Sequence, residues 1–224
     1  MVKRVLLTGV AGFVGHHFLE HFMKFTDWEV IGLARTSTVG DIGERIEANE
    51  ALRKYKDRIQ LVYADLKFGI TPFVSERIGK VDVVVHLAAN SHVDRSIDSP
   101  LDFMYDNVIG TTQLLEWVRK ENPKARVINF STDEVFGPIK SPGKFGEEDR
   151  FRPSNPYAAS KAAQTCVGYA YYNTYGMDVI NTFTMNIFGE RQNEEKLIPK
   201  AIRKIIKGEP MPVFAELNSS GELV

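Results

Sequence analysis

The sequence predicts an α/β protein built on a doubly wound parallel sheet, and two observations carry this prediction. Short, almost continuous apolar runs recur along the chain, separated by helical patterns or loops. The first of these runs meets a glycine-rich turn that opens a helix. Strands buried on both faces give continuous apolar runs, and their alternation with helices is typical of a parallel sheet. We therefore expect helices on both faces of the sheet.

The expected elements follow in chain order. The first strand lies at residues 5–7, and helical apolar spacing over 14–25 follows the glycine turn. Further strand-like runs lie at 29–34, 59–64, 81–88, 125–130 and 178–184. Residues 137–156 are rich in proline, glycine and charge, which indicates a long loop, and loops of that length are often functional. We expect a helix from Tyr157 onward and a basic amphipathic helix over 194–207.

Composition is that of an ordinary globular protein. The 224 residues are 43% hydrophobic and 25% charged, enough to bury a core, and the formal net charge is -1. A charge so close to zero offers no general attraction to nucleic acid or to an anionic membrane. The one cysteine, Cys166, excludes an internal disulfide, and we expect a small buried residue there. With no bilayer-spanning apolar run and no signal-peptide pattern, we expect a cytoplasmic protein.

The glycine-rich turn predicts a dinucleotide site. Gly9, Gly12 and Gly15 lie three residues apart between a strand and a helix, which differs by one residue from the G-x-G-x-x-G spacing. Backbone amides and a helix N-terminus at such a turn favour a pyrophosphate. The alternative is a tight turn chosen only for sterics. We expect a Rossmann-type dinucleotide-binding domain over 1–184 and a partial substrate-binding region over 185–224.

Cofactor choice depends on the end of the second strand. In NAD-binding proteins of this fold, an acidic residue there accepts a hydrogen bond from the ribose 2'-hydroxyl. Here the strand ends in Ala34 and Arg35, with no carboxylate. A guanidinium pairs well with a 2'-phosphate, so Arg35 favours NADP over NAD. The alternative is that Arg35 stacks on adenine or faces solvent.

Four proton-transferring side chains point to the reaction. Tyr157 and Lys161 are spaced i and i+4 on one helix face, so the ammonium is expected to lower the pKa of the phenol and make it a base. Asp133 and Glu134 supply a second acid and base, which elimination of water needs and simple alcohol oxidation does not. A solvated acidic pair is the alternative. Because ligands of open α/β sheets bind at the carboxyl ends of strands, their position favours a site.

Together these motifs resemble the extended short-chain dehydrogenase/reductase family, and within it the nucleotide-sugar 4,6-dehydratases of the dTDP-glucose type. The resemblance covers nearly the whole chain. Besides the glycine turn, Tyr157 and Lys161, it rests on His-Leu-Ala-Ala at 86–89, Ser-His-Val-Asp-Arg-Ser at 91–96, Ser-Thr-Asp-Glu-Val-Phe-Gly at 131–137 and Glu-Lys-Leu-Ile-Pro at 195–199. The Thr-Asp-Glu triplet is the most specific of these motifs.

The resemblance implies a role for each residue of the site. Tyr157 would take the proton of the sugar 4-hydroxyl as hydride leaves C4, and Lys161 would stabilise the phenolate and bind the nicotinamide ribose. Glu134 would remove the C5 proton of the resulting 4-keto sugar. Asp133 would protonate the departing 6-hydroxyl, and Thr132 would hydrogen-bond the 4-oxygen.

The remaining contacts also follow from the resemblance. Cofactor contacts are expected at Gly9, Gly12, Phe13, Val14, Gly15, Arg35, Asp65, Leu66, Leu87, Ala88, Ala89, Tyr157 and Lys161, and substrate contacts at Ser91, His92, Thr132, Asn186, Lys196 and Leu197. Lys196 is alternatively a solvated lysine on a basic helix. The resemblance implies a homodimer. No metal site is expected, because His17 and His21 share a helix face without a third ligand.

The sequence therefore favours an NAD- or NADP-dependent lyase, a nucleotide-sugar 4,6-dehydratase. A nucleotide-sugar 4-epimerase, or another redox enzyme of the same family, is the first alternative, and in it Asp133 and Glu134 would be dispensable. The second alternative is a dinucleotide-binding protein without turnover, because members of the family usually continue well beyond residue 224. In that comparison the chain is either a fragment or has a trimmed substrate site, and the nucleobase and sugar stay open.

Overall fold

The computed structural model describes residues 2–35, 42–43, 46–47, 49–139 and 143–211. The chain divides into two compact units, Met1–Met185 and Asn186–Val224. We describe each unit by itself. The division falls beside the expected boundary at residue 184, and residues 212–224 of the expected second region lie outside the described part of the chain.

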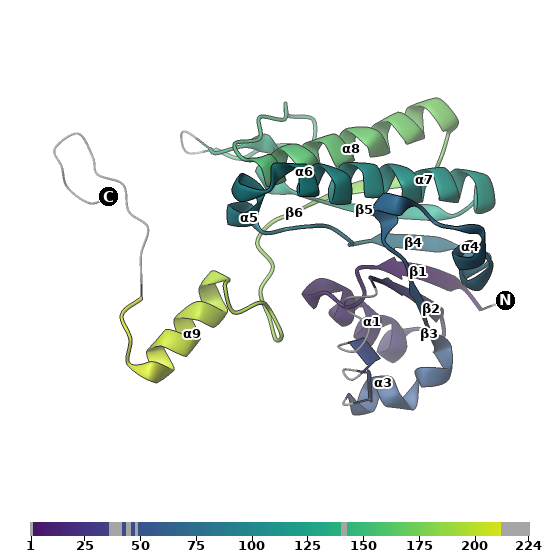
Figure 1. The fold of residues 1–224 in the computed structure, drawn as a ribbon, viewed down its shortest axis with the longest axis horizontal. Coiled ribbons are helices and arrows are strands. Elements are labelled where there is room, and N and C mark those ends of the chain that lie inside the picture. The colour runs from purple at the N-terminus through teal and green to yellow at the C-terminus, as the bar shows by residue number, and fades with distance from the viewer. Residues whose placement is uncertain (1, 36–41, 44–45, 48, 140–142, 212–224) are drawn as a thin grey trace. The chain divides into compact units, whose positions relative to one another are not determined.

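The first unit contains a six-stranded parallel sheet in the order β3-β2-β1-β4-β5-β6 (Figure 1). The strands are β1 (Arg4–Thr8), β2 (Glu29–Ala34), β3 (Ile59–Tyr63), β4 (Val83–His86), β5 (Arg126–Thr132) and β6 (Val179–Thr184). The order runs outward from β1 in both directions, which is the doubly wound arrangement. The predicted fold class is confirmed, and each predicted strand is present with its ends shifted by a few residues at most.

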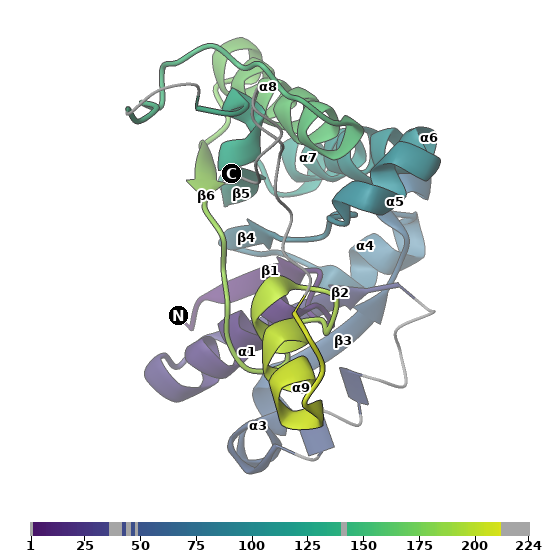
Figure 2. The same cartoon turned by 90° about the vertical axis from the view of Figure 1, so that its left-hand side faces the viewer.

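Helices cover both faces of the sheet (Figures 1 and 2). The elements between the strands are α1 (Phe13–Phe25), α3 (Glu50–Lys54), a 3-10 turn (Lys56–Arg58), η3 (Leu66–Phe68), α4 (Pro72–Ile78), α5 (Val93–Asp98), α6 (Pro100–Phe103), η4 (Met104–Ile109), α7 (Gly110–Glu121), η5 (Asp133–Phe136) and α8 (Pro156–Tyr175). Alternate residues of β1 point to opposite faces of the sheet and pack in two different hydrophobic clusters. Leu6 packs in the cluster with α4, α7 and α8, whereas Val5 and Leu7 pack in the cluster with α1 and α3.

The helical stretch between residues 100 and 121 is divided into three parts. Between α6 and α7 lies a π-helical segment, η4. π-Helical turns inside α-helices are rare and are found frequently at functional sites. Asn107, which is fully buried, lies in this segment.

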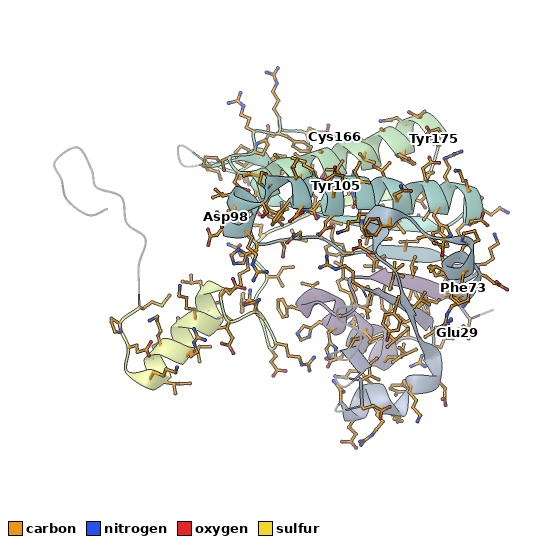
Figure 3. The ribbon with its side chains drawn as sticks, viewed as in Figure 1. Glu29, Phe73, Asp98, Tyr105, Cys166 and Tyr175 are labelled. Atoms are coloured by element: carbon orange, nitrogen blue, oxygen red, sulfur yellow. The ribbon has the colours of Figure 1, made fainter. Side chains whose placement is uncertain are left out.

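The long helix α8 carries the Tyr157 and Lys161 face. It begins after Asn155, whose side chain accepts a hydrogen bond from the backbone N–H of Ala158, and ends at Gly176 in the left-handed region. The expectation of a buried Cys166 was wrong: this residue is exposed (Figure 3). The buried positions of α8 follow a different helical stripe, so the cysteine lies on the opposite face.

The second unit contains one described helix, α9 (Leu197–Lys207), which ends at Gly208. The sequence predicted that this helix begins at residue 194, but residues 193–196 form a turn ahead of it. Within the described residues, no helix combines the length and the apolar character needed to cross a membrane.

Candidate active site

A pocket lies where β1, β2, β3 and β4 end. Its walls are Gly9, Ala11, Gly12, Leu33, Ala34, Arg35, Ala64, Asp65, Leu66, Leu87, Ala88, Ala89 and Asp106. Eight of these, Gly9, Gly12, Arg35, Asp65, Leu66, Leu87, Ala88 and Ala89, belong to the predicted cofactor contacts. Phe13, Val14 and Gly15 form the first turn of α1 directly behind Gly12 and do not line the pocket. This is the crevice at the carboxyl edge of the sheet that binds ligands in open α/β folds.

The glycines of the turn are required by close backbone contacts. Gly9 has a φ of +70°, and a Cβ there would lie 2.8 Å from the backbone nitrogen of Ala88. A Cβ on Gly15 would lie 2.2 Å from the carbonyl oxygen of Gly9. Such distances do not occur between real atoms, so a side chain at either position would displace the backbone. The glycines therefore let the turn pack closely against its own helix and against the backbone of Leu87 and Ala88, as the dinucleotide-binding motif requires.

A buried hydrogen-bond group holds the pocket wall behind the turn. The hydroxyl of Thr8 accepts hydrogen bonds from the backbone N–H groups of Leu87 and Ala88, at 3.2 and 3.1 Å. It also lies 2.8 Å from Nδ1 of His86. With both lone pairs used, the Thr8 hydroxyl donates its proton to the imidazole, so His86 carries its own proton on Nε2. This assignment requires neutral His86, whose pKa burial lowers to about 3.

Charged side chains gather at one end of the pocket. Arg35 lies 3.3 Å from Asp106 of η4, and Lys67 lies 3.9 Å from the same carboxyl and 3.5 Å from Asp65. The pKa of Asp106 is raised by burial, although Arg35 and Lys67 oppose the rise. Two cations and two carboxylates therefore compensate each other where the adenosine end of a dinucleotide is expected.

The predicted acidic pair directly follows β5. Both Asp133 and Glu134 are half-buried in η5, so they are not an exposed pair at a strand end. The hydroxyl of Thr132 donates to Oδ1 of Asp133 at 3.3 Å and accepts from the backbone N–H of Glu134 at 3.3 Å. Nδ2 of Asn155 donates to Oε2 of Glu134 at 3.1 Å. Each carboxylate thus has its own fixed donor.

Tyr157 lies beside this pair, and its pKa is shifted against the sequence-based expectation. Burial, the charge of Glu134 and the charge of Asp133 raise the pKa of Tyr157 to about 12, although hydrogen bonding to Thr132 opposes the rise. Adjacent Lys161 does not offset these effects, because burial lowers the pKa of its ammonium to about 7. A phenol in this environment needs further positive charge before it can act as a base.

The ammonium of Lys161 is held from the strand side. Nζ donates to the carbonyl oxygen of Phe130 on β5 and to Oε1 of Gln164, each at 2.6 Å. Tyr157 and Lys161 lie in the first turns of α8, and Thr132 ends β5 against the same helix. The structure therefore brings the five predicted catalytic residues to one edge of the sheet.

A comparison with known proteins defines the family. The model of the family described as GDP-mannose 4,6 dehydratase matches residues 6–220 of the chain. The chain belongs to this family. The sequence-based resemblance to nucleotide-sugar 4,6-dehydratases of the short-chain dehydrogenase/reductase type is thereby confirmed.

Relatives within and around the family support the same assignment. The glycan biosynthesis protein Agl12 of Haloferax volcanii is 36% identical over 98% of this chain and 68% of its own length. The dTDP-glucose 4,6-dehydratase of Haemophilus influenzae is 34% identical over 96% of this chain and 65% of its own length. The structure of DesIV, a dTDP-glucose 4,6-dehydratase of Streptomyces venezuelae with NAD and TYD bound, superposes with a TM-score of 0.79 at 36% identity, covering 92% of this chain and 63% of that one. The chain thus spans about two thirds of the length of these relatives.

The predicted substrate contacts are divided between the two units. In the first unit of this member of the GDP-mannose 4,6 dehydratase family, Ser91 is exposed and His92 caps α5 by accepting from the backbone N–H of Arg95 at 3.3 Å. In the second unit, Lys196 directly precedes α9 and Leu197 is its first residue. Asn186 opens that unit.

Two functional candidates were missed from the sequence. Asp106 was overlooked because no local pattern marks this acidic residue until η4 places it against Arg35. Gln164 was overlooked because a glutamine within a helical pattern is ordinarily a surface residue. The position three residues after Lys161, on the same buried face of α8, is the one signal that would have singled it out.

Proposed function

We propose that this chain is the dinucleotide-binding and catalytic part of a nucleotide-sugar 4,6-dehydratase. It would convert an NDP-hexose, such as dTDP-glucose, into the 4-keto-6-deoxy sugar with release of one water. The observation that carries the proposal is the position of Asp133 and Glu134. Two half-buried carboxylates with separate hydrogen-bond donors lie beside Tyr157, which is the equipment that elimination needs in addition to oxidation.

The first step would be oxidation at C4. Tyr157 accepts the proton of the 4-hydroxyl, and Thr132 holds the 4-oxygen by a hydrogen bond. Bound nicotinamide would supply hydride acceptance from C4 and, later, hydride donation to C6. Its positive charge in the oxidised form would offset the burial and the acidic neighbours that hold the pKa of Tyr157 high. Lys161 binds the nicotinamide ribose.

Elimination and reduction would follow. The 4-keto group acidifies the C5 hydrogen, and Glu134, kept in orientation by Asn155, removes that proton. Asp133 donates a proton to the 6-hydroxyl, which leaves as water, so that a C5–C6 double bond forms. A proton would return to C5 as C6 is reduced by the hydride that the bound cofactor would supply, which gives the 4-keto-6-deoxy product.

We further propose that the cofactor is NAD. The glycine turn lines the pocket through Gly9 and Gly12, where the pyrophosphate of a dinucleotide would lie. Arg35 predicts NADP when it is considered alone. Its 3.3 Å contact with Asp106, however, occupies the guanidinium and places a carboxylate where a 2'-phosphate would have to bind. The NAD in the DesIV structure supports this proposal by relationship.

A homodimer in a cytoplasmic setting completes the proposal. We propose that α6, η4 and α8 pair between subunits, because they carry exposed apolar and aromatic side chains: Leu101, Tyr105, Ile109, Tyr169 and Tyr172. Figure 3 labels Tyr105 among these helices. Analytical ultracentrifugation of the chain, alone and with Tyr105→Glu, tests the dimer.

The experiment that tests the activity offers the protein dTDP-, UDP-, GDP- and CDP-hexoses and follows product mass. Loss of one water with formation of a 4-keto-6-deoxy sugar supports the dehydratase. A product of unchanged mass and inverted configuration at C4 would support the epimerase instead. If the protein binds dinucleotide but converts none of the sugar nucleotides, the result would support a dinucleotide-binding protein without turnover. Because the chain spans about two thirds of its relatives, the same assay is run on a longer natural chain where one exists.

A further inference from the structure

Three amide side chains, two of them fully buried, connect the ammonium of Lys161 to two strands. Nε2 of Gln164 donates to Oδ1 of Asn129 on β5 at 2.6 Å. Nδ2 of Asn129 donates to Oδ1 of Asn181 on β6 at 2.8 Å. Gln164 and Asn129 are fully buried. The link therefore crosses from α8 to β5 and on to β6.

The two ends of this amide chain determine its direction. At one end, the ammonium of Lys161 can only donate, so Gln164 must present Oε1 to it, at 2.6 Å. At the other end, Nδ2 of Asn181 donates to the backbone carbonyl of Thr165 at 3.4 Å, and a carbonyl can only accept. The orientation of a side-chain amide is assigned from such hydrogen-bond networks. Here the Lys161 end and the Thr165 end require the same orientation of all three amides. No single amide can flip without leaving two acceptors face to face.

The space around the chain leaves its members little freedom. A Cβ on Gly168 of α8 would lie 2.5 Å from Oδ1 of Asn181, so helix and strand approach closely at this point. Buried polar groups are costly unless every member is bonded, and apolar residues would fill the same space at lower cost. A complete polar network that ends on Lys161 therefore indicates a role for the lysine rather than for packing.

We propose that Gln164 is a positioning residue for Lys161, holding its ammonium between the amide chain and the Phe130 carbonyl. The lysine would then face the nicotinamide ribose and Tyr157 with a fixed geometry and with its charge stabilised by two acceptors. This inference rests on the proposed function, in which Lys161 acts at the ribose. Among the described residues, His86 of β4 is within electrostatic reach of Lys161, and Tyr157 lies one turn before it on α8, with its acidic neighbours Glu134 and Asp133 in η5.

The test measures Lys161 directly in the full chain. Lysine labelled with ¹³C at Cε is titrated by NMR, and the Lys161 signal is assigned by its loss in Lys161→Arg. Gln164→Met keeps the size of the side chain and removes the acceptor, so the charged form loses support and the pKa of Lys161 falls by about one unit. Gln113→Met, an exposed glutamine on α7, is the matched control and leaves the titration unchanged.

The activity readout has a defined direction. A lysine that must be charged supports turnover below its pKa and loses that support as the pH rises through it, so Gln164→Met moves the alkaline limb of kcat to lower pH. The KM for the sugar nucleotide stays the same. An unchanged Lys161 titration in folded Gln164→Met overturns the inference even where the wild-type chain converts substrate. If the wild-type chain converts no sugar nucleotide, the proposed function fails and the titration still decides the inference.

A second variant covers the case in which Gln164→Met does not fold. Gln164→Glu keeps an acceptor against Nζ and adds a negative charge, so we expect the pKa of Lys161 to rise. A pKa that stays the same or falls in Gln164→Glu contradicts the positioning role.

Discussion

The guanidinium of Arg35 lies 3.3 Å from the carboxylate of Asp106, and both residues line the pocket at the carboxyl edge of the sheet. The pair joins the end of β2 to η4, 71 residues further along the chain. Asp106→Asn leaves a hydrogen-bonding side chain of the same shape and removes the charge that opposes a 2'-phosphate. We expect the affinity for NADP to rise about tenfold, with the affinity for NAD nearly unchanged, because the pair is partly exposed and therefore screened.

Isothermal calorimetry with each dinucleotide measures the change. Asp106→Asn combined with Arg35→Ala is the control, since the gain requires the guanidinium and should vanish with it. Tighter binding of NADP than of NAD by the wild-type chain would show instead that Arg35 decides the choice despite its carboxylate partner.

The acidic pair has a separate test. Asp133→Asn and Glu134→Gln should each lower the rate of dehydration at least about 100-fold, because each removes one proton transfer. Both variants should still bind dinucleotide and still oxidise C4, so reduced nicotinamide accumulates and is detected by its absorbance. Glu147→Gln, an exposed carboxyl in the following loop, serves as the control and keeps full activity. Dehydration at the wild-type rate in both variants would remove these roles.

Much of this architecture could be predicted from local patterns. The apolar run at 29–34 is β2 to the residue, because a central parallel strand is apolar on both faces and is bounded by polar residues. The glycine turn was equally accessible, because the contact that Gly15 makes with the carbonyl oxygen of Gly9 is local, although the contact of Gly9 with Ala88 is not. Asp133 and Glu134 were singled out because they follow a strand, whereas the role of Thr132 came from the family resemblance.

What could not be predicted depends on distant contacts. The partner of Arg35 comes from η4, and no local pattern at Asp106 announces it. Burial reverses the expected shift of the Tyr157 pKa, and burial is a property of the packed molecule. Cys166 was misplaced because a small residue suits either face of α8. Gln164 becomes informative only when Asn129 and Lys161 are seen at its two ends.

Gly15 offers a test of the turn itself. Gly15→Ala would place a Cβ 2.2 Å from the carbonyl oxygen of Gly9, a backbone atom that cannot move aside alone. We expect a loss of about 3 kcal/mol in the free energy of unfolding and loss of dinucleotide binding. Chemical denaturation and calorimetry measure the two effects. Gly43→Ala, where no atom lies within 4 Å of the new Cβ, should change neither. A stable Gly15→Ala protein with normal dinucleotide affinity would contradict the close contact.

The buried imidazole of His86 makes stability depend on pH. Burial, with a smaller contribution from the charge of Lys161, lowers the pKa of His86 from 6.5 to about 3. The unfolded chain therefore takes up a proton at His86 below pH 6.5 that the folded chain refuses. Stability that is present above that pH is lost, at about 1.4 kcal/mol per pH unit, as the pH falls toward 3.

The contribution of His86 is isolated by difference, because other groups also titrate in this range. His86→Asn can still accept from Thr8 but carries no titrating ring, so its stability should fall less steeply with acid than that of the wild-type chain. Urea denaturation at a series of pH values measures both slopes. His21→Asn, a change at an exposed histidine, should keep the wild-type slope. Parallel curves for the wild-type chain and His86→Asn below pH 6.5 would mean that the folded protein accommodates the proton at His86, and the tautomer assigned from Thr8 would then be wrong.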